Sequence, residues 1–109
     1  MTPKHQPVRS QQLRRSARGR SCTARIPQVC NHDPDTSVLA HPPIGNGGMG
    51  TKGDDSDGAI VCSECHDAID GRSHYGVPRE ELLECWIRAR QETDRIWREM
   101  ELIEIKGAA

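Results

Sequence analysis

Four of the five cysteines in this sequence are spaced as ligands of a metal ion would be. Cys62 and Cys65 form a Cys-x-x-Cys motif, and Cys22 and Cys30 are separated by seven residues. Two intervening residues let both sulfurs of a Cys-x-x-Cys motif turn toward one ion, and a structural zinc takes four such ligands in a closed tetrahedron. The sequence therefore predicts one structural zinc ion bound by Cys22, Cys30, Cys62 and Cys65.

Other interpretations of the cysteines remain open at this stage. The gap between Cys22 and Cys30 is wider than an ordinary zinc knuckle, and His32 could replace Cys22 as the fourth ligand. Buried reduced thiols are one alternative, and a redox-active Cys-x-x-Cys motif is another, although the βαβ pattern of a thioredoxin-like protein is missing. Cys85 falls inside a long predicted helix and is interpreted as a small buried hydrophobic residue.

Histidine and aspartate provide a second candidate site. His66 follows the Cys-x-x-Cys motif and Asp70 lies four residues later, so the two would share one face of a helix. An imidazole with a carboxylate and open water positions suits a divalent catalytic cation. The alternative is structural, with His66 packed beside the zinc or capping a helix. His41 ends a predicted strand and, taken alone, would also be structural.

The elements that would position these residues are mostly short. Extension-favouring residues predict a strand over 36–41, ended by Pro42 and Pro43. A long helix begins at Pro78 and carries apolar residues at helical spacing, with a weak point near Thr93. The other predicted elements are helical turns over 13–20, an extended segment over 22–30 with a bend at Pro27, a loop over 45–58, a helix over 63–69 and a terminal strand over 102–105.

Composition indicates one small domain with a thin core. The chain has 109 residues, 34% of them hydrophobic and 3% aromatic, with no Phe. A core this thin needs a stabilising cross-link, either a metal ion or disulfides. The odd number of cysteines and the absence of an apolar leader favour a metal ion, in a reducing cytoplasm, over disulfides. No apolar run is long enough to span a membrane. We expect a flexible basic tail over residues 1–12 and a single domain over residues 13–109.

Charge is distributed unevenly along the chain. The net charge is −1, yet residues 1–25 contain seven basic residues and no acid. Arginine dominates this stretch, and its planar fork suits phosphate oxygens, whereas Lys4 and Arg9 are better explained as a solvated tail. The Gly-rich loop departs from a P-loop because Gly50 is followed by Thr51-Lys52, so no nucleotide cofactor is expected. The residues expected to bind nucleic acid are Arg14, Arg15, Arg18, Arg20, Arg25 and Arg72.

Five motifs together resemble the YbcO-like family of small prophage nucleases. They are Arg18-Gly19-Arg20-x-Cys22, Ile26-Pro27-x-Val29-Cys30-Asn31, Thr36-x-Val38-Leu39-Ala40-His41, Lys52-x-x-Asp55 and Cys62-x-x-Cys65-His66-Asp67-Ala68-Ile69-Asp70-Gly71-Arg72. The likeness covers roughly residues 13–105. This family is similar to the HNH, or ββα-metal, endonucleases.

The resemblance implies an α+β fold: a small zinc-stapled HNH-like ββα-metal domain with a basic N-terminal arm and a long C-terminal helix. It also implies a hydrolase that cleaves DNA phosphodiester bonds with Mg²⁺ or Mn²⁺, in the cytoplasm of a bacterial host. His41 matches the strand histidine that acts as general base, and His66 the last histidine of the HNH pattern, with Asp70 as a possible further ligand. Asp55 is the first choice for the middle residue and Asp57 the second.

Two other functions fit parts of the sequence. A non-catalytic zinc-ribbon module that binds DNA would use the same cysteines and the same basic arm. A protein-interaction adaptor would instead use the acidic C-terminal helix, where residues 79–104 hold eight acids and five bases. Divalent-dependent cleavage separates the enzyme from the module, and the importance of His41 separates it from the adaptor.

Overall fold

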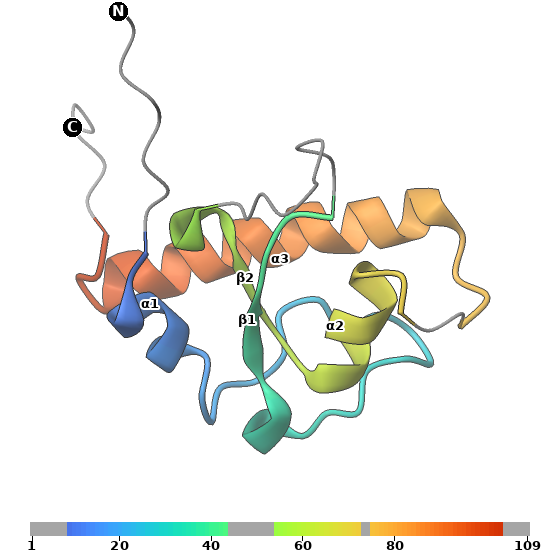
Figure 1. Ribbon diagram of the computed structural model, residues 1–109, viewed down its shortest axis with the longest axis horizontal. Helices are drawn as coiled ribbons and strands as arrows, with labels where there is room; N and C mark the ends of the chain where they lie inside the picture. Colours follow the sequence, from blue (N-terminus) through green and yellow to red (C-terminus); the bar gives the residue numbers. More distant parts are fainter. Residues whose placement is uncertain (1–8, 44–53, 73–74, 104–109) are drawn as a thin grey trace, which may run out of the picture.

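The fold is α+β, with a two-stranded sheet and a long C-terminal helix (Figure 1). This computed structural model describes residues 9–43, 54–72 and 75–103. The elements are, in chain order, α1 (Gln11–Ser16), the 3-10 turn η1 (Pro34–Thr36), β1 (Val38–Ala40), the 3-10 turn η2 (Asp55–Asp57), β2 (Ala59–Val61), α2 (Ser63–Ile69) and α3 (Arg79–Glu99).

The sheet pairs β1 with β2 in antiparallel register, with Leu39 opposite Ile60. All three residues of β2 are buried, because this strand lies between β1 and α3. Gly58 precedes β2, and a Cβ there would come within 2.6 Å of Leu39 Cδ1 and 2.8 Å of the Ala40 carbonyl oxygen. Glycine therefore lets the chain enter β2 in close contact with the end of β1.

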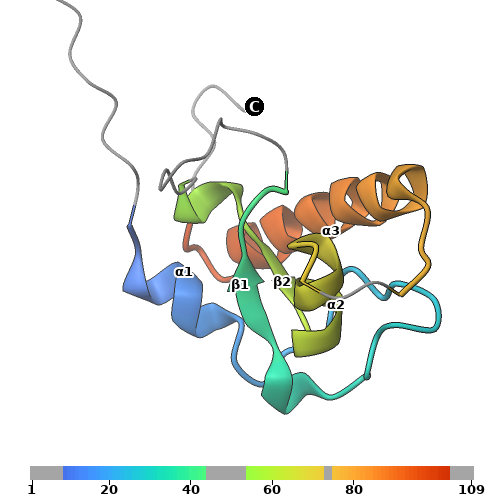
Figure 2. The same ribbon diagram turned by 45° about the vertical axis from the view of Figure 1, so that its right-hand side comes forward.

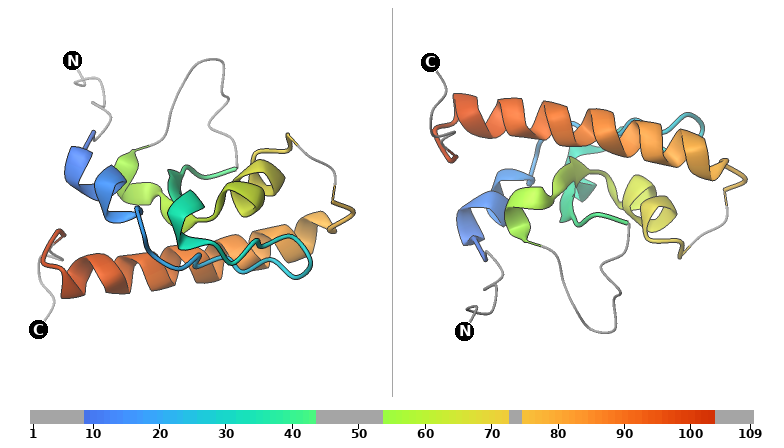
Figure 3. Two further views of the ribbon diagram at one scale, coloured as in Figure 1. Left: turned by 90° about the horizontal axis from the view of Figure 1, so that it is seen from below. Right: turned by 90° about the horizontal axis from the view of Figure 1, so that it is seen from above.

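Helix α3 forms one layer, and α1, the sheet and α2 form the other (Figure 3). Figure 2 shows the sheet in front of α3, with α1 on one side and α2 on the other. The buried residues of α3 recur every three or four positions, as an amphipathic helix requires. They are Cys85, Trp86, Ala89, Thr93 and Trp97. Cys85 is thus the buried hydrophobic residue that its helical position predicts.

Polar contacts from α3 also hold both neighbouring segments in place. Trp97 Nε1 donates to Ser16 Oγ at 2.7 Å, which joins α3 to α1. Thr93 is fully buried, and its Oγ1 accepts from the backbone amide of Ile60 in β2 at 3.0 Å. The apolar pattern is weak at Thr93 because a polar residue is buried there: the helix is continuous, and the threonine hydroxyl satisfies a buried donor of the sheet.

Several element boundaries differ from the predictions. Helix 63–69 is confirmed, and the long helix starts at Arg79, one residue later than predicted, with Pro78 as its N-cap. Strand β1 is shorter than predicted because residues 34–36 form a 3-10 turn. Helix α1 begins at Gln11, since Ser10 caps it by accepting from the Leu13 amide through its side chain.

The remaining expectations concern loops and the chain end. Residues 22–30 contain no strand; instead the Ile26 carbonyl accepts from Val29 and Cys30, which makes the bend at Pro27. Leu102 donates its amide to the Trp97 carbonyl and is not in a strand. Residues 1–8 and 44–53, which cover most of the predicted tail and loop, and residues 104–109 lie outside the described part. Within the described ranges no helix is long and apolar enough to cross a membrane.

Replacing Thr93 with valine should destabilise the protein while preserving side-chain volume. The hydroxyl is the partner of the buried Ile60 amide, so its loss leaves that donor unsatisfied at a cost of about 1–3 kcal/mol in the free energy of unfolding. Urea denaturation at fixed zinc concentration measures the change. Gln91→Ala, at an exposed position of the same helix, is the control and should change stability by less than about 0.5 kcal/mol.

Candidate functional site

The four predicted ligand cysteines lie together in the structure. Cys62 is the N-cap of α2, and its sulfur accepts from the Cys65 amide at 3.4 Å. The bend at Pro27 brings Cys22 and Cys30 to the same place, so that all four sulfurs lie within 4.8 Å of one another. The Cys30 and Cys62 sulfurs are 3.8 Å apart, which is about the edge of a tetrahedron with zinc–sulfur bonds near 2.3 Å.

This cluster could hold a metal ion such as zinc. Cys22, Cys62 and Cys65 are buried and Cys30 is half-buried, so the site is closed to bulk water as in structural zinc sites. A hydrogen bond from Cys65 lowers the pKa of Cys22 to about 5, and burial raises the pKa of Cys30 to about 11. A second thiolate would meet the first at close range, and a divalent cation would remove that repulsion.

His32 lies beside this cluster, whereas Cys22 belongs to it. The His32 Nδ1 atom is 3.7 Å from the Cys30 sulfur, and the side chain is exposed. All five cysteines are free thiols, and Cys85 is not part of the four-cysteine set. The geometry therefore favours the four-cysteine ligand set over the alternative that includes His32.

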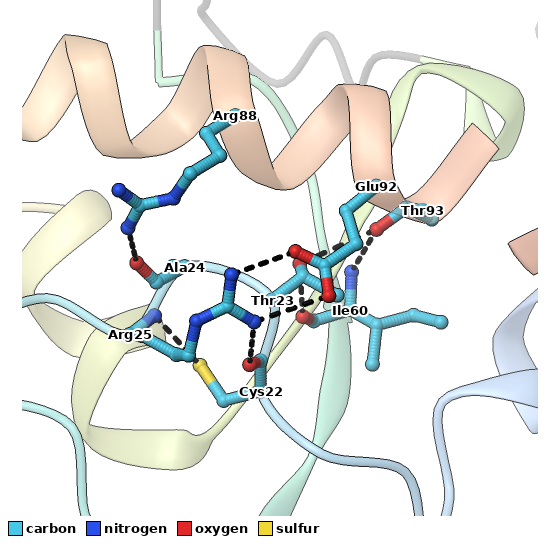
Figure 4. Close-up of polar contacts among 8 residues, drawn as sticks. All are labelled: Cys22, Thr23, Ala24, Arg25, Ile60, Arg88, Glu92 and Thr93. Carbon is cyan, nitrogen blue, oxygen red and sulfur yellow. Dashed lines mark hydrogen bonds and ion pairs between the residues drawn. The ribbon is translucent and has the colours of Figure 1, made fainter. Parts of the chain in front are cut away.

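The loop that carries Cys22 is attached to α3 by charged and polar contacts (Figure 4). Arg25 donates to both carboxylate oxygens of Glu92, at 3.1 and 2.8 Å, and to the Cys22 carbonyl at 3.3 Å. The hydrogen bond with Glu92 raises the pKa of Arg25. Arg88 reaches the Ala24 carbonyl at 2.5 Å. Arg25, expected from the sequence to bind phosphate, is thus engaged in orienting a cysteine loop.

A second cluster forms around His41, directly after β1. His41 Nε2 lies 3.0 Å from Asp55 Oδ1. The other carboxylate oxygen, Oδ2, accepts from the Ser10 backbone amide at 2.6 Å and lies 3.3 Å from Arg14 Nε. Asp55 is 1% exposed, whereas the His41 side chain is 31% exposed. The structure thus joins the first-choice aspartate to His41, while Asp57 points into solvent at the end of the same turn.

These contacts determine the charge of Asp55 and the tautomer of His41. Burial acts to raise the pKa of Asp55, but the hydrogen bond from Ser10, the contact with His41 and the charge of Arg14 outweigh it and leave the pKa below its usual value. The carboxylate is therefore ionised at neutral pH and can only accept hydrogen bonds. A neutral His41 then carries its proton on Nε2, which leaves the lone pair of Nδ1 available.

The third predicted group lies on α2. His66 Nε2 is 3.1 Å from Asp70 Oδ2, and both side chains are half-buried on one face of the helix, as their spacing predicts. Adjacent ligands of an octahedral ion with bonds near 2.1 Å are about 3.0 Å apart, so this pair fits such an ion. Arg72 also contacts Asp70 Oδ2, at 3.0 Å, and lies 3.7 Å from Asp67.

Among the described residues, only the four cysteines form a group of three or more potential metal ligands. A cation bound by His66 and Asp70 would therefore complete its shell with water or substrate oxygens, which is the usual arrangement for Mg²⁺. Such a site would be open to a phosphate group, in contrast to the closed cysteine cluster.

The arginines expected to bind nucleic acid divide into two groups. Arg14, Arg15 and Arg18 line a pocket of about 260 Å³ together with Gln11, on α1 and the turn that follows it. Arg20, Arg25 and Arg72 do not line this pocket: Arg20 donates to the Met100 sulfur at 3.0 Å, and Arg25 and Arg72 contact the carboxylates named above. Sequence reasoning missed Ser10 as a partner of Asp55, because 45 residues separate them and no local pattern connects them.

The fold and these clusters define a small α+β protein with a cysteine site suited to a metal ion and with two histidine–aspartate pairs. A family model described as "Putative nuclease YbcO" matches residues 11–102, and the chain belongs to this family. The family predicted from the five motifs is thereby confirmed, and its matched members, described by that same name, come from a bacterium and a phage.

The relatives cover most of the chain. "Putative nuclease YbcO" of Escherichia coli strain K12 and "Putative nuclease ybcO" of Enterobacteria phage 82 are each 49% identical over 86 residues, which is 78% of this chain and 88% of theirs. A solved structure described as "a putative bacteriophage protein from Escherichia coli str. K-12 substr. MG1655" superimposes with a TM-score of 0.68 at 41% identity, over 83% of this chain and 100% of the other.

The cysteine cluster leads to a prediction about metal content. The purified protein should contain about one zinc ion per chain, as measured by elemental analysis. Cys65→Ser should lose both the zinc and the folded state, because the site joins segments that a thin core alone does not hold together. Cys85→Ser, at the buried cysteine outside the cluster, should keep the zinc. A zinc-free protein that remains folded in a strong chelator would contradict the assignment.

Proposed function

We propose that this protein is a metal-dependent DNA endonuclease of the HNH, or ββα-metal, type, with His41 as its general base. The observation that carries the proposal is the pair formed by His41 and the buried, ionised Asp55. Burying an ionised carboxylate costs free energy unless the carboxylate is hydrogen-bonded or paired with a positive charge. Here the buried carboxylate contacts a half-exposed imidazole and orients it, which is typical of a functional site. Membership of a family described as nucleases supports the same reaction class.

The order of elements agrees with this proposal. Strands β1 and β2 are followed directly by α2, which gives the β-β-α succession of the HNH-like motif. His41 lies directly after β1, and His66 lies in the middle of α2, next to Cys65. A zinc ion in the cysteine cluster would hold the start of α2 and so determine the place of His66 relative to the sheet.

In the proposed reaction His41 accepts the proton of the attacking water on Nδ1. Asp55 Oδ1 accepts from Nε2, so it keeps Nδ1 free of a proton beforehand and stabilises the imidazolium afterwards. The arrangement uses the two oxygens of Asp55 separately, one for His41 and one for the Ser10 amide and Arg14. Asp55 is therefore assigned to positioning, while His41 touches the reacting water.

His66 and Asp70 would hold the catalytic cation, Mg²⁺ or Mn²⁺. When bound, such an ion stabilises the charge that develops on the phosphate and on the leaving oxygen. Arg72 already contacts Asp70, so it would share that carboxylate with the ion or turn toward a substrate phosphate. The substrate would be the DNA backbone, contacted by the arginines of α1 with little sequence information, and the setting the cytoplasm of a bacterial host.

Removing the base should abolish cleavage and leave binding intact. We expect His41→Ala to lower the nicking rate on plasmid DNA with Mg²⁺ or Mn²⁺ by roughly a hundred- to ten-thousand-fold, with zinc content and DNA affinity nearly unchanged. Asp55→Asn should also slow nicking, because an amide can present an N–H to Nε2 and so favour the wrong tautomer. The matched control is Asp57→Asn, two residues along the same turn, which should cleave normally.

Full activity of His41→Ala, in a preparation free of contaminating nuclease, would end the HNH proposal. DNA binding by the wild type without cleavage under any divalent ion would instead favour the zinc-ribbon binding module. That alternative is favoured by the basic pocket on α1, which would serve binding equally well without chemistry.

The basic pocket predicts salt-dependent DNA binding. Replacing Arg14, Arg15 and Arg18 together with glutamine should weaken binding and make the plot of log affinity against log salt less steep by about 0.9 for each duplex phosphate that is no longer neutralised. Fluorescence anisotropy at several salt concentrations measures both quantities. The control makes the same substitution at three exposed arginines of α3, Arg79, Arg95 and Arg98. This control should bind DNA almost as the wild type does. An unchanged slope in the α1 variant would assign the pocket another role.

A further inference from the structure

Arg14 belongs to two of the clusters described above. Its side chain lines the pocket on α1 with Gln11, Arg15 and Arg18, and its Nε atom lies 3.3 Å from Asp55 Oδ2. Helix α1 and the turn η2, which carries Asp55, lie side by side in both views of Figure 3. The same guanidinium therefore faces a surface suited to phosphate and a buried carboxylate that orients His41.

The geometry of the guanidinium allows both contacts at once. The polar contacts of Arg14 in the described structure come from Nε, to Asp55 Oδ2 and, at 3.4 Å, to the Ser10 carbonyl oxygen. Both contacts share the single Nε–H, which leaves the four N–H donors of the two Nη groups for other partners. The side chain is 53% exposed, so these Nη donors can reach a ligand in the pocket while Nε stays with Asp55.

We propose that Arg14 is a positioning residue that binds a backbone phosphate of the nucleic acid and holds Asp55 at the same time. The inference rests on the proposed function and assigns a specific residue to couple substrate binding to the general base. A bound phosphate restricts the half-exposed Arg14 side chain to the rotamer that also contacts Asp55. Asp55 in turn holds Nε2 of His41, so the base is best oriented when the DNA backbone occupies the pocket.

Ser10 also contacts Asp55, independently of Arg14. Its amide donates to Asp55 Oδ2 at 2.6 Å, so this oxygen keeps one hydrogen bond when Arg14 is lost, while the contact that links it to the pocket is removed. Loss of Arg14 should therefore leave fold and zinc content intact. It should reduce only the improvement in His41 orientation that DNA binding brings. Lysine separates the two tasks, because a single ammonium is a point charge for phosphate and cannot span both partners in one plane.

The first test measures nicking in single turnover at saturating plasmid concentration. Arg14→Gln should be slower than Arg15→Gln by roughly ten- to a hundred-fold, since small misplacements of a catalytic group have effects of this size. Arg14→Lys should recover DNA affinity but not the rate. Arg95→Gln, at an exposed position of α3, is the control and should match the wild type. Equal rates for Arg14→Gln and Arg15→Gln would overturn the coupling.

The second test needs no catalysis. Inorganic phosphate is titrated into the labelled zinc-loaded protein at constant pH, and the imidazole nitrogens of His41 and the Nε groups of the α1 arginines are followed by NMR. The resonances of Arg14 and His41 should shift together in the wild type and in Arg95→Gln, and the His41 shift should vanish in Arg14→Gln. A response at Arg14 without one at His41 would refute the coupling, and no response at any α1 arginine would refute the phosphate site.

The two tests distinguish failure of this inference from failure of the proposed function. If the wild type does not cleave DNA but phosphate still shifts His41 through Arg14, the coupling stands and the endonuclease assignment falls. If the wild type cleaves DNA but phosphate does not shift His41, the endonuclease assignment stands and the coupling falls.

Discussion

The convergence of four cysteine sulfurs is the constraint on which the arrangement of this protein depends. Cys30 and Cys62 are 32 residues apart in the chain, yet their sulfurs are 3.8 Å apart. The cluster joins the loop before β1, the end of β2 and the start of α2. With no Phe and few other aromatic residues, the core is thin, and a metal ion at this junction would supply cohesion that apolar burial supplies in larger domains.

Helix α3 supplies the second layer of support, through polar contacts as well as apolar packing. Thr93 binds the Ile60 amide of β2, Trp97 binds Ser16 of α1, and Glu92 binds Arg25 in the cysteine loop. These contacts lie close together along the helix, so one helical face positions the sheet, the basic helix and the cysteine cluster. The acidic residue Glu92 therefore has a structural task, which weakens the case for an adaptor that uses this helix as a binding surface.

The candidate catalytic cluster and the cysteine cluster differ in how their side chains are exposed to solvent. The cysteines form a closed set in which buried thiols satisfy one another, as a structural metal requires. Around His41 the burial is graded: Asp55 is inaccessible, His41 is half-exposed and Arg14 is more exposed still. Exposure thus increases from the buried carboxylate to the solvent-exposed guanidinium. This is the arrangement expected where a protein binds a charged substrate and water at the same site.

The sequence by itself determined the features that depend on local spacing: the Cys-x-x-Cys motif, the helix over residues 63–69 and the shared face of His66 and Asp70, because helical period relates residues a few positions apart. The motifs also sufficed to assign the family. Only the tertiary structure decided which charged groups meet. Arg25 and Arg14 look equivalent in one basic stretch, yet Arg25 is paired with Glu92, 67 residues away, while Arg14 faces Asp55 and the pocket on α1. These contacts result from the packing of α1 and α3 against the sheet, and electrostatic partners brought together by packing leave no periodic signal in the chain.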